Sequence, residues 1–319
     1  MIKDSTFIPA KYAANPHIQS MWPTFIMRRQ ADLKTRRERL ELTDGDFLDL
    51  EWYGNQTGPI IILLHGVTGN MTSPYIKYLM PELAAYGWQP VMMYYRGYSG
   101  EHNRLNIGTH AGQTDDLATL IKLLKQRHPN TALAALGFSQ GGNMLLKYLG
   151  EYQNKALLNC ALAVSPPFQL RSIANRIRHG ISKFYQWYLL RELREFYRTK
   201  FQYRPAPFDL KNIDRYHSFW QFDDKITAPL NGFKGAVDYY RQASCGNYLA
   251  SITTPTLIIH AKDDTFMSAD IIPTAKALSN TTILELSAHG GHLGFVSGTL
   301  FKPHFWLADR IPDFLQNYL

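Results

Sequence analysis

Strand-length apolar segments alternate with longer segments of helical periodicity along most of this 319-residue chain. Parallel strands need crossover connections, and helices supply them while covering both faces of the sheet. The alternation therefore predicts an α/β fold with a mostly parallel central sheet. The predicted strands cover residues 60–64, 89–94, 131–136, 158–164, 256–260 and 282–286. The predicted helices cover residues 73–86, 113–127, 140–152, 269–278 and 302–317.

Two segments depart from this alternation. Residues 1–40 mix prolines, aromatic residues and basic residues, and we expect them to form an arm packed over the core. Residues 40–42 and 47–52 alternate apolar and polar around a turn sequence, which predicts a β-hairpin. Residues from about 167 to 250 hold no clear strand and are rich in Tyr, Phe, Trp and Arg. We expect a helical cap insertion there, over the carboxyl edge of the sheet, within a single domain spanning 1–319.

The composition is that of a globular protein, with 45% hydrophobic and 19% charged residues. The formal net charge is +8, and much of the excess lies between Arg28 and Arg39 and between Arg171 and Arg204. Such an excess can attract anionic lipid or nucleic acid, although solvated helix faces and loops are the favoured interpretation. No nucleic-acid-binding motif accompanies these charges, so we expect no nucleic-acid partner. Weak association with a membrane surface stays open.

The chain has two cysteines, Cys160 and Cys245, which are too few for a disulfide framework. Residues 1–14 contain no apolar core of a signal peptide. No segment approaches the roughly 18 apolar residues that a membrane-spanning helix needs. These features predict a protein of a reducing compartment, the cytoplasm.

Gly137, Ser139 and Gly141 form a Gly-x-Ser-x-Gly motif between the predicted strand 131–136 and the predicted helix 140–152. A sharp strand-to-helix turn of this kind is typical of a nucleophile elbow, which holds the serine hydroxyl clear of the backbone. By itself the motif can also be a glycine-rich connection without chemistry. Its context favours Ser139 as a nucleophile.

A serine hydroxyl needs a base within hydrogen-bond reach, and the base needs an orienting acid. We expect the base to be His292, in a glycine-rich segment after the last predicted strand, with His289 as the second choice. The acid should follow an earlier strand, and Asp264 fits the usual loop pattern better than Asp263. The order serine, acid, histidine is that of α/β hydrolases, and the other aspartate is expected to hold the turn.

A tetrahedral intermediate also needs an anion site. The glycine-rich segment 65–69 follows the predicted strand 60–64, so the backbone N–H groups of Val67 and Gln140 are expected to form an oxyanion hole. His65 is expected to be a structural support. The same turn lacks the lysine and glycine pattern of phosphate-binding loops.

Arg96 follows another predicted strand at the same edge. It could meet an anionic group of a substrate, but we favour a buried ion pair with Asp115 or Asp116. No Cys or His residues have the spacing of a zinc site, and we expect neither a metal nor another cofactor.

Nearly the whole chain resembles the α/β-hydrolase superfamily and, more narrowly, the bacterial YheT-like hydrolases. The motifs that carry the resemblance are Asn-Pro-His-Ile-Gln-Ser at 15–20, Asp-Gly-Asp-Phe at 44–47, His-Gly-Val-Thr-Gly at 65–69, Arg-Gly at 96–97, Gly-Phe-Ser-Gln-Gly-Gly-Asn at 137–143, Asp-Asp at 263–264 and Gly-His-Leu-Gly-Phe at 291–295. The resemblance implies a serine esterase that acts on carboxylic or short acyl esters. Gln140 stands where many relatives have Leu or Met, which leaves the mechanism intact because only its backbone N–H is needed.

The leading hypothesis is therefore a serine hydrolase that cleaves short- to medium-chain acyl esters through an acyl-enzyme on Ser139. Its partner would be a small-molecule ester. One alternative is a lipase or acyltransferase working at a membrane surface. Another is a non-catalytic ligand-binding protein on a hydrolase scaffold.

Overall fold

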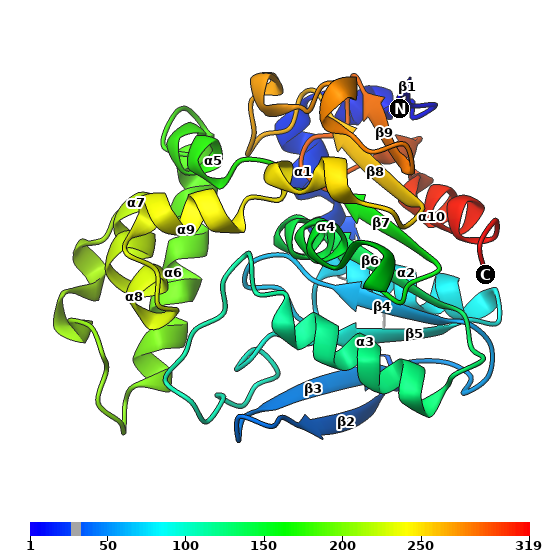
Figure 1. Cartoon of the computed structure of the whole chain (residues 1–319). Coiled ribbons are helices and arrows are strands. Elements are labelled where there is room, and N and C mark those ends of the chain that lie inside the picture. The colour runs from blue at the N-terminus through cyan, green and yellow to red at the C-terminus, as the bar shows by residue number, and fades with distance from the viewer. Residues whose placement is uncertain (27–32) are drawn as a thin grey trace.

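The computed structural model describes residues 1–26 and 33–319, so Arg28 and Arg29 of the first basic stretch lie outside the described residues. A nine-stranded sheet has the order β1-β9-β8-β7-β6-β4-β5-β3-β2 (Figure 1). Only the β2–β3 and β3–β5 pairings in this sheet are antiparallel, among the residues described. Its strands are β1 (Ile2–Asp4), β2 (Arg36–Glu41), β3 (Phe47–Trp52), β4 (Ile60–Leu64), β5 (Gln89–Met93), β6 (Leu133–Phe138), β7 (Cys160–Val164), β8 (Thr256–Ala261) and β9 (Thr282–Ser287). The mostly parallel α/β fold expected from the alternation is confirmed.

Helices cover both faces of this sheet (Figure 1). The apolar side chains of α3 (Asp115–Arg127) and α4 (Gln140–Tyr152) pack on one face. Those of α2 (Pro74–Ala85) and α10 (Leu307–Leu315) pack on the other. A strand buried on both faces is apolar throughout, which explains the unbroken run of Ile and Leu in β4.

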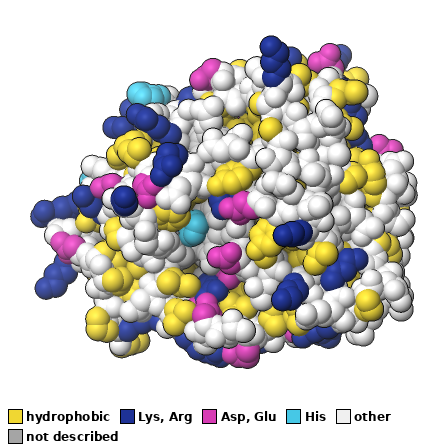
Figure 2. All heavy atoms as spheres, viewed as in Figure 1, with side chains coloured by type: hydrophobic (Ala, Val, Ile, Leu, Met, Phe, Trp, Pro, Cys, Tyr) yellow, Lys and Arg dark blue, Asp and Glu magenta, His cyan; other side chains and the backbone are white. Residues whose placement is uncertain are grey.

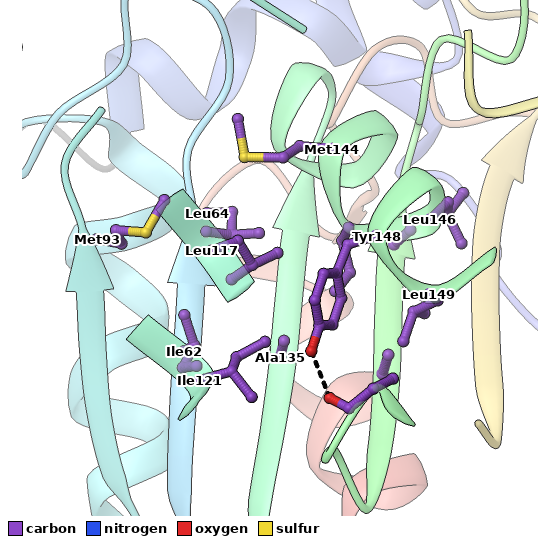
Figure 3. Packing of buried hydrophobic residues seen from close by; sticks show 14 of the residues in the cluster. Ile62, Leu64, Met93, Leu117, Ile121, Ala135, Met144, Leu146, Tyr148 and Leu149 are labelled. Atoms are coloured by element: carbon purple, nitrogen blue, oxygen red, sulfur yellow. Dashed lines mark hydrogen bonds between the residues drawn. The ribbon is translucent and has the colours of Figure 1, made fainter. Parts of the chain in front are cut away.

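The core is closely packed on the face that α3 and α4 cover (Figure 3). Ile62 of β4 and Leu117 of α3 are fully buried there, while Ile61 belongs to the cluster on the opposite face. Tyr148 is also buried in this layer, and its hydroxyl donates to the carbonyl oxygen of Ala156 at 2.6 Å. A buried tyrosine needs such a partner, because an unsatisfied hydroxyl destabilises the core.

The segment between β7 and β8 contains helices and no strand in the described structure, and we call it the cap (Figure 1). It joins the core partly through Lys200, whose ammonium donates to the side-chain oxygen of Asn103 at 2.6 Å. Arg204 adds a bond to the carbonyl oxygen of Asn103 at 2.9 Å. The helices of the cap are α5 (Leu170–Arg176), α6 (Ser182–Lys200), α7 (Phe219–Phe222), α8 (Ala228–Leu230) and α9 (Ala236–Ala243).

Most predicted elements are observed with ends displaced by one or two residues, but two expectations need correction. The predicted helix 269–278 is wrong: the segment has two short 3₁₀ turns, because Pro273 disfavours the helical conformation at the residue before it. Residues 303–305 of the predicted helix 302–317 form β11 (Pro303–Phe305), which pairs with β10 (Val296–Gly298). The described part of residues 1–40 contains α1 (Pro16–Ile26), most of β2, and β1 at the sheet edge.

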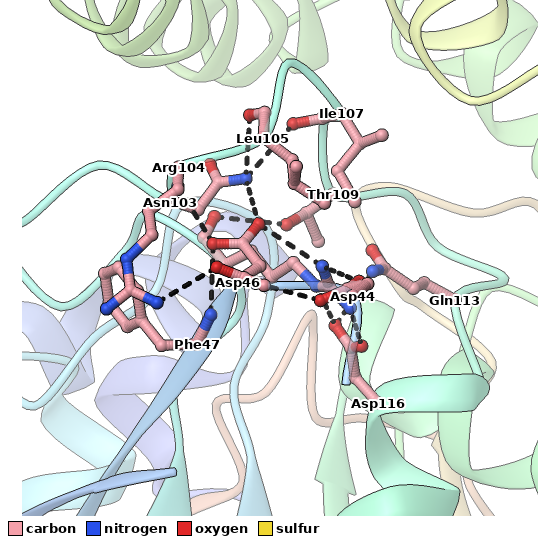
Figure 4. Close-up of polar contacts among 12 residues, drawn as sticks. Asp44, Asp46, Phe47, Asn103, Arg104, Leu105, Ile107, Thr109, Gln113 and Asp116 are labelled. Carbon is pink, nitrogen blue, oxygen red and sulfur yellow. Dashed lines mark hydrogen bonds and ion pairs between the residues drawn. The ribbon is translucent and has the colours of Figure 1, made fainter. Parts of the chain in front are cut away.

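Arg96 lies just beyond the end of β5 and pairs with three carboxylates of a polar cluster. Figure 4 shows these carboxylates, Asp44, Asp46 and Asp116, close together. The guanidinium of Arg96 donates two hydrogen bonds to Asp116, at 2.6 and 2.9 Å. It also pairs with Asp44 at 2.6 Å and with Asp46 at 3.2 Å. These carboxylates raise the pKa of Arg96, although burial opposes them. The favoured ion-pair interpretation is confirmed with Asp116, so this arginine is already fully engaged within the protein.

Replacing Arg96 with alanine should lower the free energy of unfolding by about 3–5 kcal/mol, because it leaves buried carboxylates unpaired. Arg104→Ala is the matched control, since Arg104 pairs with Glu41 at the surface and its loss should leave the free energy of unfolding nearly unchanged. Urea denaturation of both variants measures the difference. Equal losses would show that the cluster around Arg96 does not stabilise the fold.

Candidate active site

Ser139 lies at the sharp turn between β6 and α4, at the carboxyl edge of the sheet. Its backbone has φ 51° and ψ −116°, a conformation that non-glycine residues rarely adopt. The flanking glycines permit this turn: a Cβ on Gly141 would lie 2.3 Å from the carbonyl oxygen of Leu64. A Cβ on Gly137 would likewise lie 2.4 Å from the carbonyl oxygen of Gly141. A strained serine between two glycines that leave no room for a side chain is the geometry of a nucleophile elbow.

His292 and Asp264 are brought to this serine by loops that follow β9 and β8. The Nε2 atom of His292 lies 3.0 Å from Oγ of Ser139. Its Nδ1 atom lies 2.9 Å from Oδ2 of Asp264. The Asp264 side chain is 1% exposed and that of His292 is 9% exposed. A buried carboxylate in this position makes Nδ1 the protonated nitrogen and leaves Nε2 free to accept the serine proton.

Asp263 and His289, the second choices for the acid and the base, contact the loop rather than the serine. Asp263 accepts a hydrogen bond from the backbone N–H of Gly291 at 2.9 Å. It also lies 3.3 Å from Nδ1 of His289, whose side chain is half exposed. Asp263 and His289 therefore hold the loop that carries His292, and neither contacts Ser139 in the part of the chain described.

Two side chains of helix α1 also hold the loop that carries His292. The Oγ atom of Ser20 accepts the backbone N–H of His292 at 2.8 Å and donates to the carbonyl oxygen of Pro16. Gln19 is fully buried and bonds both backbone groups of Val296, at 2.8 and 2.9 Å. The Asn-Pro-His-Ile-Gln-Ser motif thus has a structural explanation, because it fixes the segment from His292 to Val296.

Ser20→Ala should reduce kcat by about tenfold with little change in KM, which corresponds to an activation free energy about 1.4 kcal/mol higher. The expected cause is a less well oriented His292 imidazole. Ser20→Thr keeps the hydroxyl and is the control. Steady-state kinetics on a soluble ester measure both variants, and an unchanged kcat in Ser20→Ala would rule out this positioning role.

The residues of the expected anion site lie beside the serine. Val67 and Gln140 line the same cavity as Ser139. Gln140 is the first residue of α4, so its N–H has no partner within the helix. No acceptor contacts either N–H among the described residues. Thr68, which follows Val67, has φ 55°, as expected of a turn that directs backbone groups inward.

His65 lies under this turn and is completely buried. Its Nδ1 lies 2.7 Å from the carbonyl oxygen of Gly66, and its Nε2 lies 3.4 Å from the backbone nitrogen of Tyr95. Burial lowers the pKa of His65 to about 4, so the ring stays neutral. Both ring nitrogens are engaged away from Ser139, which makes His65 a support for the turn.

A cavity of about 880 Å³ opens beside Ser139, between the sheet edge and the cap. His292 and the turn around Val67 form part of its wall. Phe266 covers one face of the His292 ring, with ring centroids 4.2 Å apart, and stacks in turn on Tyr185 of α6. The apolar wall contributed by the cap includes Leu170, Ile173, Ile177, Leu189, Leu193 and Phe222.

Within residues 1–26 and 33–319, no three His, Cys, Asp or Glu side chains are arranged to hold a metal ion. Both cysteines are buried and unpaired with one another. None of the described helices is both long enough and apolar enough to cross a membrane.

The structure thus brings together Ser139, His292 and Asp264, and places Val67 and Gln140 on the wall of the same cavity. The roles of Ser20 and Gln19 were not predicted from the residues. Their only signal was the motif shared with the family. Phe266 was also missed, because nothing in a loop sequence indicates that an aromatic ring will stack on a particular histidine.

The comparisons with known proteins agree with this geometry. A family model described as alpha/beta hydrolase fold matches residues 59–299. The chain is 40% identical to "Putative esterase YheT" of Escherichia coli (strain K12), over 98% of this chain and 94% of that protein. It is 28% identical to mouse phospholipase ABHD3, over 92% of this chain and 74% of that protein.

Among solved structures, the Pyrococcus furiosus esterase Pf2001 aligns over 99% of both chains, with a TM-score of 0.57 and 16% identity. That likeness shows the fold alone. The family match and the identity to YheT show membership of a family as well as a fold, and both alignments cover the serine turn and the two loops that face it. The chain therefore belongs to the α/β-hydrolase fold family, in its YheT-like branch.

Proposed function

We propose that this protein is a serine esterase that hydrolyses short- to medium-chain acyl esters through an acyl-enzyme. The observation that carries the proposal is the chain of contacts from Asp264 through His292 to Oγ of a strained Ser139 at the cavity wall. Membership of a hydrolase family that includes named esterases supports it.

The mechanism follows from these positions. Oγ of Ser139 attacks the ester carbonyl carbon while Nε2 of His292 takes its proton, and the ionised Asp264 stabilises the imidazolium. The N–H groups of Val67 and Gln140 donate to the oxyanion. His292 then returns the proton to the leaving alcohol. A water molecule, activated by the same imidazole, hydrolyses the acyl-enzyme and restores Ser139.

The apolar wall of the cap suits an acyl chain. Each buried methylene contributes about 0.8 kcal/mol, so kcat/KM should rise about two- to fourfold per added methylene until the chain fills the cavity. A series of 4-nitrophenyl esters from acetate to dodecanoate tests this, with the optimum expected at short to medium length. If no ester of the series is cleaved above the background of Ser139→Ala, the proposed function is wrong.

A second candidate, action at a membrane surface, is favoured by the outer face of α6. Ile181 and Trp187 are 63% and 53% exposed, and the basic residues Lys183 and Arg191 lie among them. The neighbouring Phe184 and Tyr188 line the cavity, so this face adjoins the entrance. Figure 2 shows Lys and Arg side chains projecting from the cap, at the left of the view, with hydrophobic side chains beside them. Apolar and basic groups together suit an anionic lipid surface.

Co-sedimentation with phosphatidylglycerol and phosphatidylcholine vesicles tests this candidate. Binding should require the anionic lipid and weaken about tenfold in a variant with Ile181→Ser and Trp187→Ser. Phe301→Ser is the matched control, because Phe301 is 92% exposed at a site far along the chain. If the protein binds neither kind of vesicle, the membrane-surface candidate is wrong and the hydrolysis of soluble esters stands as the proposed function.

A further inference from the structure

Asp223 is a buried carboxylate on the wall of the cavity, at the start of a π-helical turn over Asp223–Thr227 in the cap. Its Oδ1 accepts the hydroxyl of Thr227 at 2.7 Å, and its Oδ2 accepts the hydroxyl of Tyr240 at 2.7 Å. Thr227 and Tyr240 line the same cavity. Single π-helical turns occur frequently at functional sites.

This carboxylate has no cationic partner among the described residues. The adjacent Asp224, by contrast, pairs with Lys225 at 3.0 Å near the surface. Burial raises the pKa of Asp223 to about 6, and only the two hydroxyls oppose that rise. A carboxylate has about four acceptor sites, and the two hydroxyls occupy two of them. Above neutral pH, Asp223 therefore presents an uncompensated negative charge with free acceptor sites.

Aromatic rings line the cavity around this charge. They belong to Tyr197, Phe219, Phe222, Tyr239 and Tyr240. Ring faces attract cations, and the attraction grows where water is excluded. A carboxylate among aromatic rings is a combination that suits an ammonium group better than a neutral apolar group.

Asp223 is connected to the candidate active site through a short series of contacts. Asn143, in the first turn of α4 after Ser139, donates to the carbonyl oxygen of Ala111 at 2.9 Å. The N–H of Ala111 donates to the hydroxyl of Tyr239 at 3.0 Å. The ring of Tyr239 lies 5.3 Å from that of Tyr240, measured between centroids. One cavity holds Ser139 and Asp223, so one molecule can occupy both places.

We propose that Asp223, with Tyr240 and Thr227, forms a subsite for an ammonium group. The inference rests on the proposed function and makes it narrower: the preferred substrates are esters that carry a cationic amine at a distance from the scissile carbonyl. The ammonium compensates the buried carboxylate, and the aromatic rings cover its methyl or methylene groups. The scissile carbonyl then lies at Ser139.

Matched esters test this subsite by catalysis. The probes are 4-nitrophenyl esters of alkanoic acids that end in a trimethylammonium group, and the isosteric esters that end in an uncharged tert-butyl group, over a range of chain lengths. At pH 8 and the best length, kcat/KM should favour the cationic ester by about tenfold or more. Asp223→Asn should remove this preference, so that the kcat/KM values of the cationic and the uncharged ester lie within about threefold of each other. Asp224→Asn is the matched control and should keep the preference.

A binding measurement tests the subsite without catalysis. Calorimetric titration of Ser139→Ala with octyltrimethylammonium should give a Kd about tenfold weaker after Asp223→Asn is added. Equal Kd values, or equal hydrolysis of cationic and uncharged esters at every length, would overturn the subsite while leaving the esterase intact. Hydrolysis that persists in Ser139→Ala would instead overturn the proposed function, and the titration would still decide the subsite.

Discussion

Ser139→Ala is expected to lower kcat for a soluble 4-nitrophenyl ester by about 10⁶-fold, because no other group in the proposed mechanism forms the acyl-enzyme. The loss should be in kcat, since the cavity that binds the acyl chain is unchanged. Stopped assays with high enzyme concentration measure the residual rate.

The control for this variant is its stability. Ser139 occupies a positive-φ conformation at the turn, and no buried hydrogen bond of the core depends on its hydroxyl. The melting temperature of Ser139→Ala should therefore equal that of the wild type within a few degrees. Ser73→Ala alters another serine of the cavity wall and should retain activity within a few-fold. A Ser139→Ala protein that stays folded and retains most of its activity would contradict the proposed mechanism.

Asp264→Asn is expected to lower kcat by about 10⁴-fold, because an amide can donate to Nδ1 of His292 and so fix the wrong tautomer. The adjacent Asp263 offers a matched comparison. It bonds the N–H of Gly291 and lies beside His289, so Asp263→Asn should cost about tenfold or less through the position of the loop.

The two asparagine variants should be compared on the same ester, with far-ultraviolet circular dichroism to confirm that both fold. We expect the two losses in kcat to differ by about three orders of magnitude. The reason is that only Asp264 contacts the imidazole of His292, through Oδ2 and Nδ1. Similar losses, or a larger loss in Asp263→Asn, would mean that the acid of the mechanism has been assigned to the wrong residue.

The parallel strands and the edge of the sheet that carries the candidate site could be predicted from the sequence, because their local patterns agree with the topology of the fold. The parallel strands are buried on both faces, so their apolar runs are visible without knowledge of the partners. Parallel topology then brings the segments after β6, β8 and β9 to one edge, so the loops that carry Ser139, Asp264 and His292 were expected to lie together. The choice of Asp264 over Asp263 depended in addition on the local loop pattern.

Other segments could not be predicted, mainly because their conformation depends on partners that are distant in the sequence. β1 is three residues long and is a strand only because it pairs with β9 at the other end of the chain. β11 was predicted to be helical, and its pairing with β10 overrides the local preference. Residues 269–278 have helical periodicity, but Pro273 prevents a continuous helix.

The polar details of the cavity were likewise beyond prediction. Asp223 begins the π-helical turn and Tyr240 lies in α9, with α8 and a loop between them, so their contact depends on how the cap helices pack. Ser20 reaches His292 from the opposite end of the chain. Neither contact has a periodic signal in the sequence, because side-chain hydrogen bonds between distant segments are set by the tertiary structure.

In the proposed mechanism, Ser139 is an activated nucleophile. A fluorophosphonate reacts covalently with a serine whose hydroxyl is activated by a neighbouring base, and peptide mass spectrometry locates the adduct. We expect stoichiometric labelling of the peptide that contains Ser139, much slower labelling in His292→Ala, and none at that peptide in Ser139→Ala. A folded wild-type protein that stays unlabelled, or an adduct on any other residue, would contradict this mechanism.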